Sequence, residues 1–121
     1  MFLVDINVRL ELLLEQERAD EVRQFLQTTE TSQLSITDFS LYSIGIILTR
    51  LKKDALFLDF LSDTIEESGV TRVHLSTSDL RQLLTIRQQF PLDFDDAYQY
   101  AAAEKHEFVL ISFDGDFDQT T

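Results

Sequence analysis

The chain has 121 residues, no cysteine, and 22 acidic against 10 basic side chains, so its formal net charge is −12. This length fits a single domain, 1–121, that can bury roughly two-thirds of its unfolded surface without a disulfide or structural metal. A hydrophobic fraction of 44% excludes a disordered acidic tail, and the lack of Cys excludes disulfide scaffolds and thiolate zinc sites. The negative charge argues against a simple nucleic-acid coat, which needs a basic surface.

Apolar spacing in the first 65 residues predicts two strands and four helices. Three apolar residues before Asp5 are too few for a helix and fit a buried strand. We expect Asn7 to cap the first helix, and Thr37 or Asp38 to cap the third. The expected elements are a strand at 2–4, a helix after 7, a helix at 19–26, a polar loop at 30–33, a strand at 34–36, a helix ending at 48 and a helix at 55–65.

The second half of the chain continues this alternation. Gly69, which can take a positive φ, ends the fourth helix. A capping box at 76–79 opens a helix that runs to Phe90, and Pro91 breaks it. The other expected elements are a strand at 70–75, an Ala-rich helix at 93–106 and a buried strand at 108–111. We therefore predict an α/β fold, a three-layer α/β/α sandwich with a short, mostly parallel central sheet.

No segment is typical of a targeting or membrane-spanning sequence. The apolar start of the chain stops at Asp5, and the most apolar run, 44–48, is followed by Arg50. Both runs are far shorter than a signal peptide or a membrane span of roughly 18 residues. We expect a cytoplasmic protein with no membrane partner.

Acidic residues are concentrated at the end of the chain, where residues 93–121 carry eight acids and one base, or −7 of the −12. Asp5 follows the first strand, Asp114 follows the last, and Asp96 lies in the first turn of the preceding helix. Ligands bind in open α/β sheets at the carboxyl ends of the strands, so we expect these three carboxylates to meet there. Their mutual repulsion favours a hard cation with oxygen ligands, Mg²⁺ or Mn²⁺, which suits phosphodiester hydrolysis.

Structural explanations compete with this functional one. Asp5 could cap a helix, although Asn7 is better placed to do so. Asp93 and Asp95 are better explained as acids that stabilise the N-terminus of a helix. The acidic run at 114–118 could be a solvated turn, and by itself it is a weak signal.

The order and spacing of these pieces resemble PIN-domain proteins, a nuclease family that includes the toxins of many bacterial toxin–antitoxin pairs. Residues 2–7, Phe-Leu-Val-Asp-Ile-Asn, resemble the family's strand that ends in Asp-Thr-Asn. Residues 96–103 resemble its Asp-Ala helix, and residues 110–117 resemble its strand and Thr-x-Asp-x-Asp-Phe turn. The resemblance covers nearly the whole chain.

This resemblance implies a metal-dependent endoribonuclease that hydrolyses RNA with Mg²⁺ or Mn²⁺. The acids that match its catalytic positions are Asp5, Asp96 and Asp114. The same three, with Asp116, are the implied metal ligands. Asn7 and Ser112 match polar residues that support the site. The implied partners are an RNA substrate and an antitoxin protein.

The sequence departs from the family where a Glu usually follows the second strand. Leu41 or Ser43 occupies the best-matching positions, and Asp38 is the nearest acid and a candidate substitute. An alternative is therefore a PIN-like protein with a weakened site that acts as an RNA- or protein-binding module.

Two further expectations concern surfaces. The helices at 39–48 and 55–65 carry more apolar surface than one sheet face needs, which favours a homodimer or another partner, although all of it could be core. The basic residues outside the acidic end are expected to be available to phosphates, among them Arg9, Arg50, Lys52 and Lys53.

Overall fold

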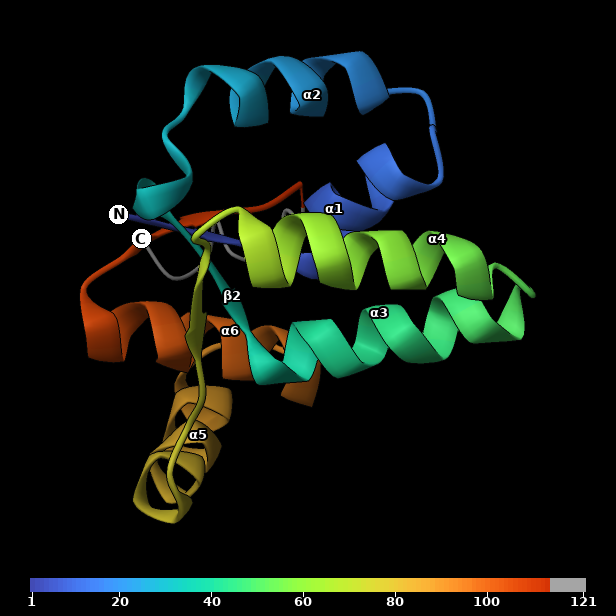
Figure 1. The fold of residues 1–121 in the computed structure, drawn as a ribbon. Helices are drawn as coiled ribbons and strands as arrows, with labels where there is room; N and C mark the ends of the chain where they lie inside the picture. Colours follow the sequence, from blue (N-terminus) through green and yellow to red (C-terminus); the bar gives the residue numbers. More distant parts are fainter. Residues whose placement is uncertain (114–121) are drawn as a thin grey trace.

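The structure is a computed structural model that describes residues 1–113 (Figure 1). The roles predicted for Asp114 and Asp116 therefore lie outside the described residues. Within this part of the chain the strands are β1 (Phe2–Val4), β2 (Leu34–Thr37), β3 (Thr71–Val73) and β4 (Val109–Ile111). They form one sheet in the order β3-β2-β1-β4, and each neighbouring pair is parallel. The carboxyl ends of all four strands therefore lie at the same edge.

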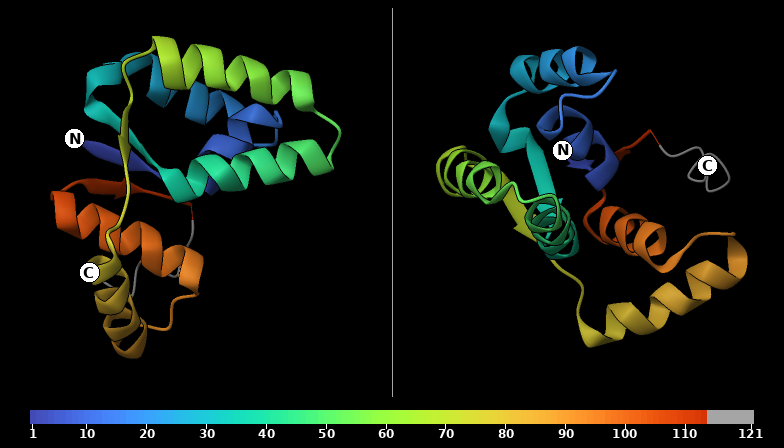
Figure 2. Two further views of the ribbon diagram at one scale, coloured as in Figure 1. Left: turned by 60° about the horizontal axis from the view of Figure 1, so that its bottom comes forward. Right: turned by 90° about the vertical axis from the view of Figure 1, so that its right-hand side faces the viewer.

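Helices connect the strands and cover both faces of the sheet. The α-helices are α1 (Ile6–Leu13), α2 (Ala19–Thr28), α3 (Asp38–Arg50), α4 (Asp54–Phe60), α5 (Thr77–Gln89) and α6 (Phe94–His106). Two irregular helices are η1 (Thr31–Gln33), a 3-10 turn, and η2 (Leu61–Glu67), a π-helix. One side of the sheet packs against α5 and α6 and the other against α1 to α4 (Figure 2). This arrangement confirms the predicted α/β/α sandwich.

Strand β1 lies between β2 and β4, which explains why its sequence is entirely apolar. Successive side chains of a strand point to opposite faces. Leu3 packs in the cluster beside α5 and α6, whereas Val4 packs in the cluster beside α1 and α2, and neither is exposed to solvent. A strand that is buried on both faces needs a continuous apolar run rather than an alternating one.

The helix caps correct one prediction and confirm another. Asp5, not Asn7, is the N-cap of α1, and its Oδ1 accepts a hydrogen bond from Ile6 N at 2.8 Å. The prediction was wrong because α1 starts directly after β1, so Asp5 still has extended backbone angles and is in the capping position. Thr37 caps α3 by accepting from Ser40 N at 2.9 Å.

The capping box of α5 is present as predicted: Ser76 and Asp79 each accept a backbone hydrogen bond from the other. Two other segments differ in detail. The polar loop at 30–33 contains η1, and the helix expected at 55–65 is α4, which continues without a break into the π-helix η2. Gly69 follows with a φ of 84°, consistent with its predicted role as a helix stop.

Helices α3 and α4 form an antiparallel pair that extends away from the sheet (Figure 1). Ile44 and Leu48 of α3 are buried, whereas Tyr42, Ile46 and Leu58 are exposed. The apolar surface predicted here is therefore divided between core and solvent. None of the helices within residues 1–113 has the length and hydrophobicity needed to cross a membrane.

Candidate active site

Asp5 is a buried carboxylate at the carboxyl end of β1, with 2% of its surface exposed. Its backbone N–H donates to Ile111 O at 2.9 Å, so the parallel pairing of β1 with β4 continues to this residue. Its Oδ1 caps α1 through Ile6 N. The backbone around the carboxylate is therefore held by a strand on one side and by a helix N-terminus on the other.

Ser112 follows the last residue of β4 and lies beside Asp5. Its Oγ donates a hydrogen bond to Asp5 Oδ2 at 2.9 Å. Asn7 contacts the same hydroxyl, with its Nδ2 donating to Ser112 Oγ at 3.3 Å, and its Oδ1 accepts from Phe113 N at 3.4 Å. The structure thus brings together Asp5, Asn7 and Ser112, three of the residues that sequence analysis selected, by contacts across 105 to 107 positions of the chain.

A second set of contacts reaches Asp5 from α6. Gln99 is 2% exposed, and its Nε2 donates to Asp5 Oδ1 at 3.0 Å. Its Oε1 accepts from Thr37 Oγ1 at 2.6 Å. Thr37 Oγ1 also accepts from Ser40 N, so its one proton is free to point to Gln99 and the amide orientation is determined. Gln99 therefore ties the Asp5 carboxylate to the cap of α3.

Gln99 was not predicted as a site residue, because amide residues are common on helix surfaces. A usable signal was its spacing of three residues from Asp96, on a helix otherwise rich in Ala, since residues three apart share a helix face. A polar residue on the buried face of such a helix needs a polar partner. Thr37 was recognised as a candidate cap but not as a contact of Gln99.

Asp96 lies in the first turn of α6 and is partly buried. It precedes Gln99 by one helical turn on the same face, and Gln99 contacts Asp5. Asp96 and Gln99 therefore lie on the same face of α6. Asp93 is the residue before this helix and Asp95 is in its first turn, as the structural explanation of these two acids requires.

Asp38 is the first residue of α3, next to the end of β2, and its carboxylate points to the neighbouring strand. Arg72 of β3 donates to Asp38 Oδ1 from Nε at 2.7 Å, and the same guanidinium contacts the Tyr42 hydroxyl at 3.4 Å. Asp38 raises the pKa of Arg72 through this hydrogen bond. Because β3 is two strands away from β1, this ion pair directs Asp38 away from Asp5. Its role as a substitute metal ligand stays a prediction.

One basic residue that was predicted to be exposed is buried. Arg9 of α1 is buried and contacts Ser35 O, so it is not part of the exposed basic surface. Arg50, Lys52 and Lys53, by contrast, are exposed at the turn between α3 and α4. The available basic surface is therefore concentrated at the tip of this helix pair.

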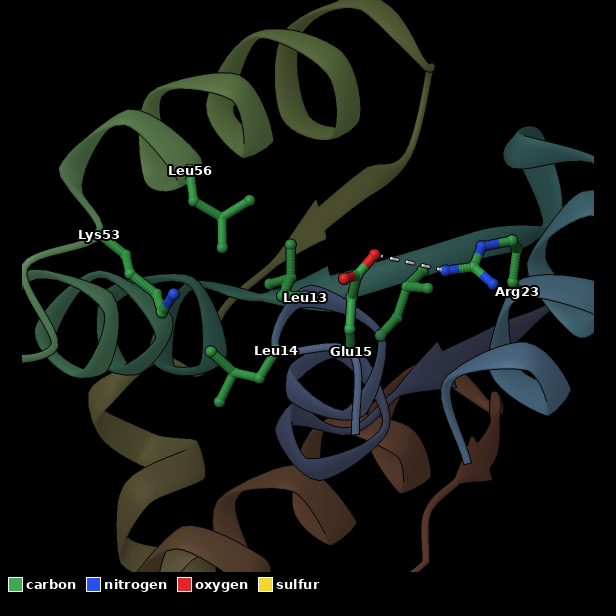
Figure 3. Close-up of a pocket in the computed structure, with 7 residues that line it drawn as sticks. Leu13, Leu14, Glu15, Arg23, Lys53 and Leu56 are labelled. Atoms are coloured by element: carbon green, nitrogen blue, oxygen red, sulfur yellow. Dashed lines mark ion pairs between the residues drawn. The ribbon is translucent and has the colours of Figure 1, made fainter. Parts of the chain in front are cut away.

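A groove of about 540 Å³ lies between the end of α1, the middle of α2 and the start of α4 (Figure 3). Leu12, Leu13, Leu14 and Leu56 supply its apolar lining. Its charged lining consists of Glu15, Arg23 and Lys53, and Arg23 lies 4.0 Å from the Glu15 carboxylate.

Comparison with known protein families matches residues 2–121 to the PIN domain. The chain belongs to the PIN domain family. This confirms the resemblance inferred from the strand ends and the Asp-Ala helix. A comparison with curated proteins found no match.

Solved structures share the fold of this PIN domain. A toxin of Mycobacterium tuberculosis, VapC20, described as cleaving the sarcin-ricin loop, superposes with a TM-score of 0.84 at 16% identity over 99% of this chain and 95% of its own. A toxin–antitoxin complex from Klebsiella pneumoniae gives 0.76 at 21% identity, covering 97% and 90%. The FitAcB structure from Neisseria gonorrhoeae gives 0.78 at 19% identity, covering 98% and 92%. At these identities the likeness establishes the fold.

The helix in which PIN proteins usually carry a Glu is α3 in this chain. Leu41 is 4% exposed and packs in the core with Ile44 and Leu48, whereas Ser43 is partly buried. Neither side chain is a carboxylate ligand. Among residues 1–113, no group of three or more His, Asp or Glu side chains is close enough to hold a metal ion.

Proposed function

We propose that this PIN domain is an endoribonuclease that depends on Mg²⁺ or Mn²⁺, and that it is the toxin of a toxin–antitoxin pair. The observation that carries the proposal is the buried Asp5 carboxylate at the end of the central strand, held by Ser112 and Gln99. Ligand sites of parallel α/β sheets lie at this edge. Family membership supports nuclease chemistry at that position.

The donor atoms at this edge fit a hard divalent cation. Asp5, Asn7 and Ser112 supply oxygen atoms of the type that Mg²⁺ and Mn²⁺ prefer. Asp96 shares a face of α6 with Gln99, which contacts Asp5, and this supports its inclusion. We propose Asp5, Asp96, Asp114 and Asp116 as the metal ligands. Such an ion supplies Lewis acidity and lowers the pKa of a bound water.

The residues of the chain position this site. Ser112 and Gln99 each direct one hydrogen bond at a different oxygen of Asp5, so the carboxylate cannot rotate without losing one of them. Holding ligands in one orientation before the substrate arrives is how a site avoids reorganisation during the reaction. We assign Asp5, Asp96 and Asp114 as the catalytic acids, with Asn7 and Ser112 in support.

The RNA backbone needs cations to bind, and the net charge of −12 opposes binding. Arg18, Arg23, Arg72 and Lys105 form ion pairs with acids of the chain. The exposed turn that joins α3 to α4, with Arg50, Lys52 and Lys53, is our candidate for phosphate contacts. Affinity for RNA should therefore be weak and should fall steeply with salt.

The solved structures support an antitoxin partner, since one similar fold is described as a toxin–antitoxin complex and another as a toxin. The groove of Figure 3 is our candidate for its docking, because leucines form an apolar lining and Glu15, Arg23 and Lys53 contribute charges of both signs. Leu56→Glu should prevent co-purification with a small protein encoded next to this gene, while RNA cleavage continues. Unchanged co-purification would exclude the groove.

The nuclease proposal is tested by RNA cleavage with Mg²⁺ or Mn²⁺ in the wild type, Asp5→Asn and Asp96→Asn. Both substitutions keep the size of the side chain, remove its charge and replace one acceptor oxygen by an NH2 donor, so we expect loss of cleavage with retained folding. Asp59→Asn is a matched control on an exposed position of α4 and should cleave normally. Equal cleavage by all four proteins would refute the assignment.

The second candidate is a binding module with a weakened site, favoured by Leu41 and Ser43 where PIN proteins usually carry a Glu. Thermal unfolding with millimolar Mn²⁺ separates the two. Metal that binds the folded state raises the free energy of unfolding by RT ln(1 + [L]/Kd), and the melting temperature rises with it. A shift that disappears in Asp5→Asn supports the nuclease, and no shift in the wild type supports the module.

A homodimer stays a prediction. It is supported by three exposed apolar side chains of α3 and α4, Tyr42, Ile46 and Leu58. Light scattering at micromolar concentration tests it. A monomer mass would count against self-association through α3 and α4. A dimer that dissociates in Ile46→Lys would place the interface on α3.

A further inference from the structure

Arg9 is a buried cation without a counter-ion among the described residues. Only 4% of its surface is exposed, and one contact is recorded for its guanidinium, a long hydrogen bond of 3.4 Å from Nη2 to Ser35 O. Its Nε has no hydrogen-bond partner within residues 1–113. Burial lowers the pKa of Arg9 to about 10, which leaves the group charged at neutral pH.

A buried charge in this state is costly, because it has lost its hydration and has gained little in return. Native proteins rarely leave such N–H groups unpaired, so an unpaired one calls for an unseen partner. The missing partner of Arg9 must accept hydrogen bonds and should carry negative charge. No acid of the described chain meets this requirement.

Arg9 also lines a cavity of about 120 Å³, which is room for about four water molecules. Three hydroxyl-bearing residues line the same space: Thr31 of η1, Thr64 of η2 and Ser68. Leu34 is at the amino end of β2, so the cavity opens at the edge of the sheet opposite to Asp5. It is therefore separate from the candidate active site.

The wall of this cavity is built by irregular backbone. Thr64 belongs to the π-helix η2, and such helices occur frequently at functional sites. Ser68 Oγ donates to Thr64 O and accepts from Val70 N at 3.4 Å, which fixes the turn after the π-helix. Gly69, with its φ of 84°, completes that turn beside Thr31.

We propose that this cavity is a binding site for a phosphate-type oxyanion, with Arg9 as its cationic anchor and Thr31 and Thr64 as hydroxyl donors. A guanidinium offers several N–H donors in a planar fork that matches phosphate oxygens. The described residues that line the cavity include no acid that would repel an anion. Two sources share this chemistry: free inorganic phosphate and the terminal phosphate of a nucleoside 5′-monophosphate.

Thermal unfolding and calorimetric titration test the proposal with the full chain, at constant ionic strength set by NaCl. Phosphate at ten times its Kd should raise the melting temperature of the wild type by about 5 °C. Arg9→Met should raise the melting temperature without phosphate, since it removes the unpaired charge, and should abolish the response to phosphate. Thr64→Val keeps Arg9 and should weaken phosphate binding several-fold in a folded protein.

Arg81→Met is the matched control, because Arg81 is an exposed residue of α5 and its loss should leave the phosphate response intact. It also reports the general stabilisation that phosphate gives to any protein. Binding of inorganic phosphate alone identifies a free ion, and binding of both ligands identifies a site that accepts monoesters. No binding by the wild type, or an unchanged response in Arg9→Met, overturns the proposal. RNA cleavage is not part of the readout, so the result is independent of the nuclease proposal.

Discussion

Replacing Gln99 by Leu tests whether the contacts behind Asp5 act as one network. The substitution keeps the volume of a side chain that is 2% exposed but removes both of its hydrogen bonds. A hydrogen bond to a charged group contributes about 1.5 to 3 kcal/mol, and a buried donor left unpaired costs about 1 to 3 kcal/mol. We expect Gln99→Leu to lower the free energy of unfolding by about 3 kcal/mol.

A double-mutant cycle with Thr37→Val gives the sharper result. In Gln99→Leu the Thr37 hydroxyl loses its acceptor, whereas in the double variant that hydroxyl is absent, so this unpaired donor no longer exists. The double variant should therefore be more stable than the sum of the single effects, by about 1 to 2 kcal/mol. The loss of the α3 cap occurs with and without Gln99, so it cancels from the cycle.

Urea unfolding with linear extrapolation measures all four proteins. Gln88→Leu, at an exposed position of α5, is the control for the chemical change and should alter stability by less than about 0.5 kcal/mol. The melting-temperature shift by Mn²⁺ should also shrink in Gln99→Leu, because Asp5 loses one of the bonds that orient it. Additive stabilities within about 0.5 kcal/mol would refute the network.

Three further predictions concern the rest of the fold. The hydrogen bond from Lys105 holds the pKa of Asp79 at about 2, against an ordinary 3.8. The stability that this pair contributes is therefore present above pH 3.8 and is lost as the pH falls through 2. In acid unfolding, the stability of Lys105→Met should differ most from that of the wild type above pH 4. Gly45→Ala places a Cβ 2.8 Å from the Phe57 ring. Because the cost of overpacking exceeds the gain in helix propensity, the substitution should lower the free energy of unfolding by about 1 kcal/mol, which urea unfolding can check. Leu48→Ala should cost about 2 to 5 kcal/mol in the same assay, and a smaller loss would mean that α3 packs loosely.

The sequence predicted the sheet edge well because strand ends are marked by short apolar runs. Asp5 and Ser112 each follow such a run, and in a parallel sheet this alone brings them to one edge. The cap of α1 could not be predicted as easily, because Asp5 and Asn7 are both good caps and the choice depends on how closely the helix follows the strand.

Two polar residues show where sequence reasoning ends. Gln99 and Arg9 are both of types that are usually exposed, and their spacing on the helix does not reveal what packs over them. Their burial follows from how α6 and α1 are rotated against the sheet, a consequence of tertiary packing that involves the whole core. Likewise, no local sequence pattern in residues 61–67 predicts the π-helix η2.

The contacts that orient Asp5 also bear on when during synthesis the protein can acquire activity. Gln99 and Ser112 lie 94 and 107 positions after Asp5, and β1 is paired in the sheet with the last described strand. A ribosome must therefore release the chain as far as Ser112 before the carboxylate is held in place. A truncated or still-growing polypeptide would have the first acid of the site but not its fixed geometry. For a protein proposed to cut RNA inside its own cell, this order of assembly would delay cleavage until synthesis has passed Ser112.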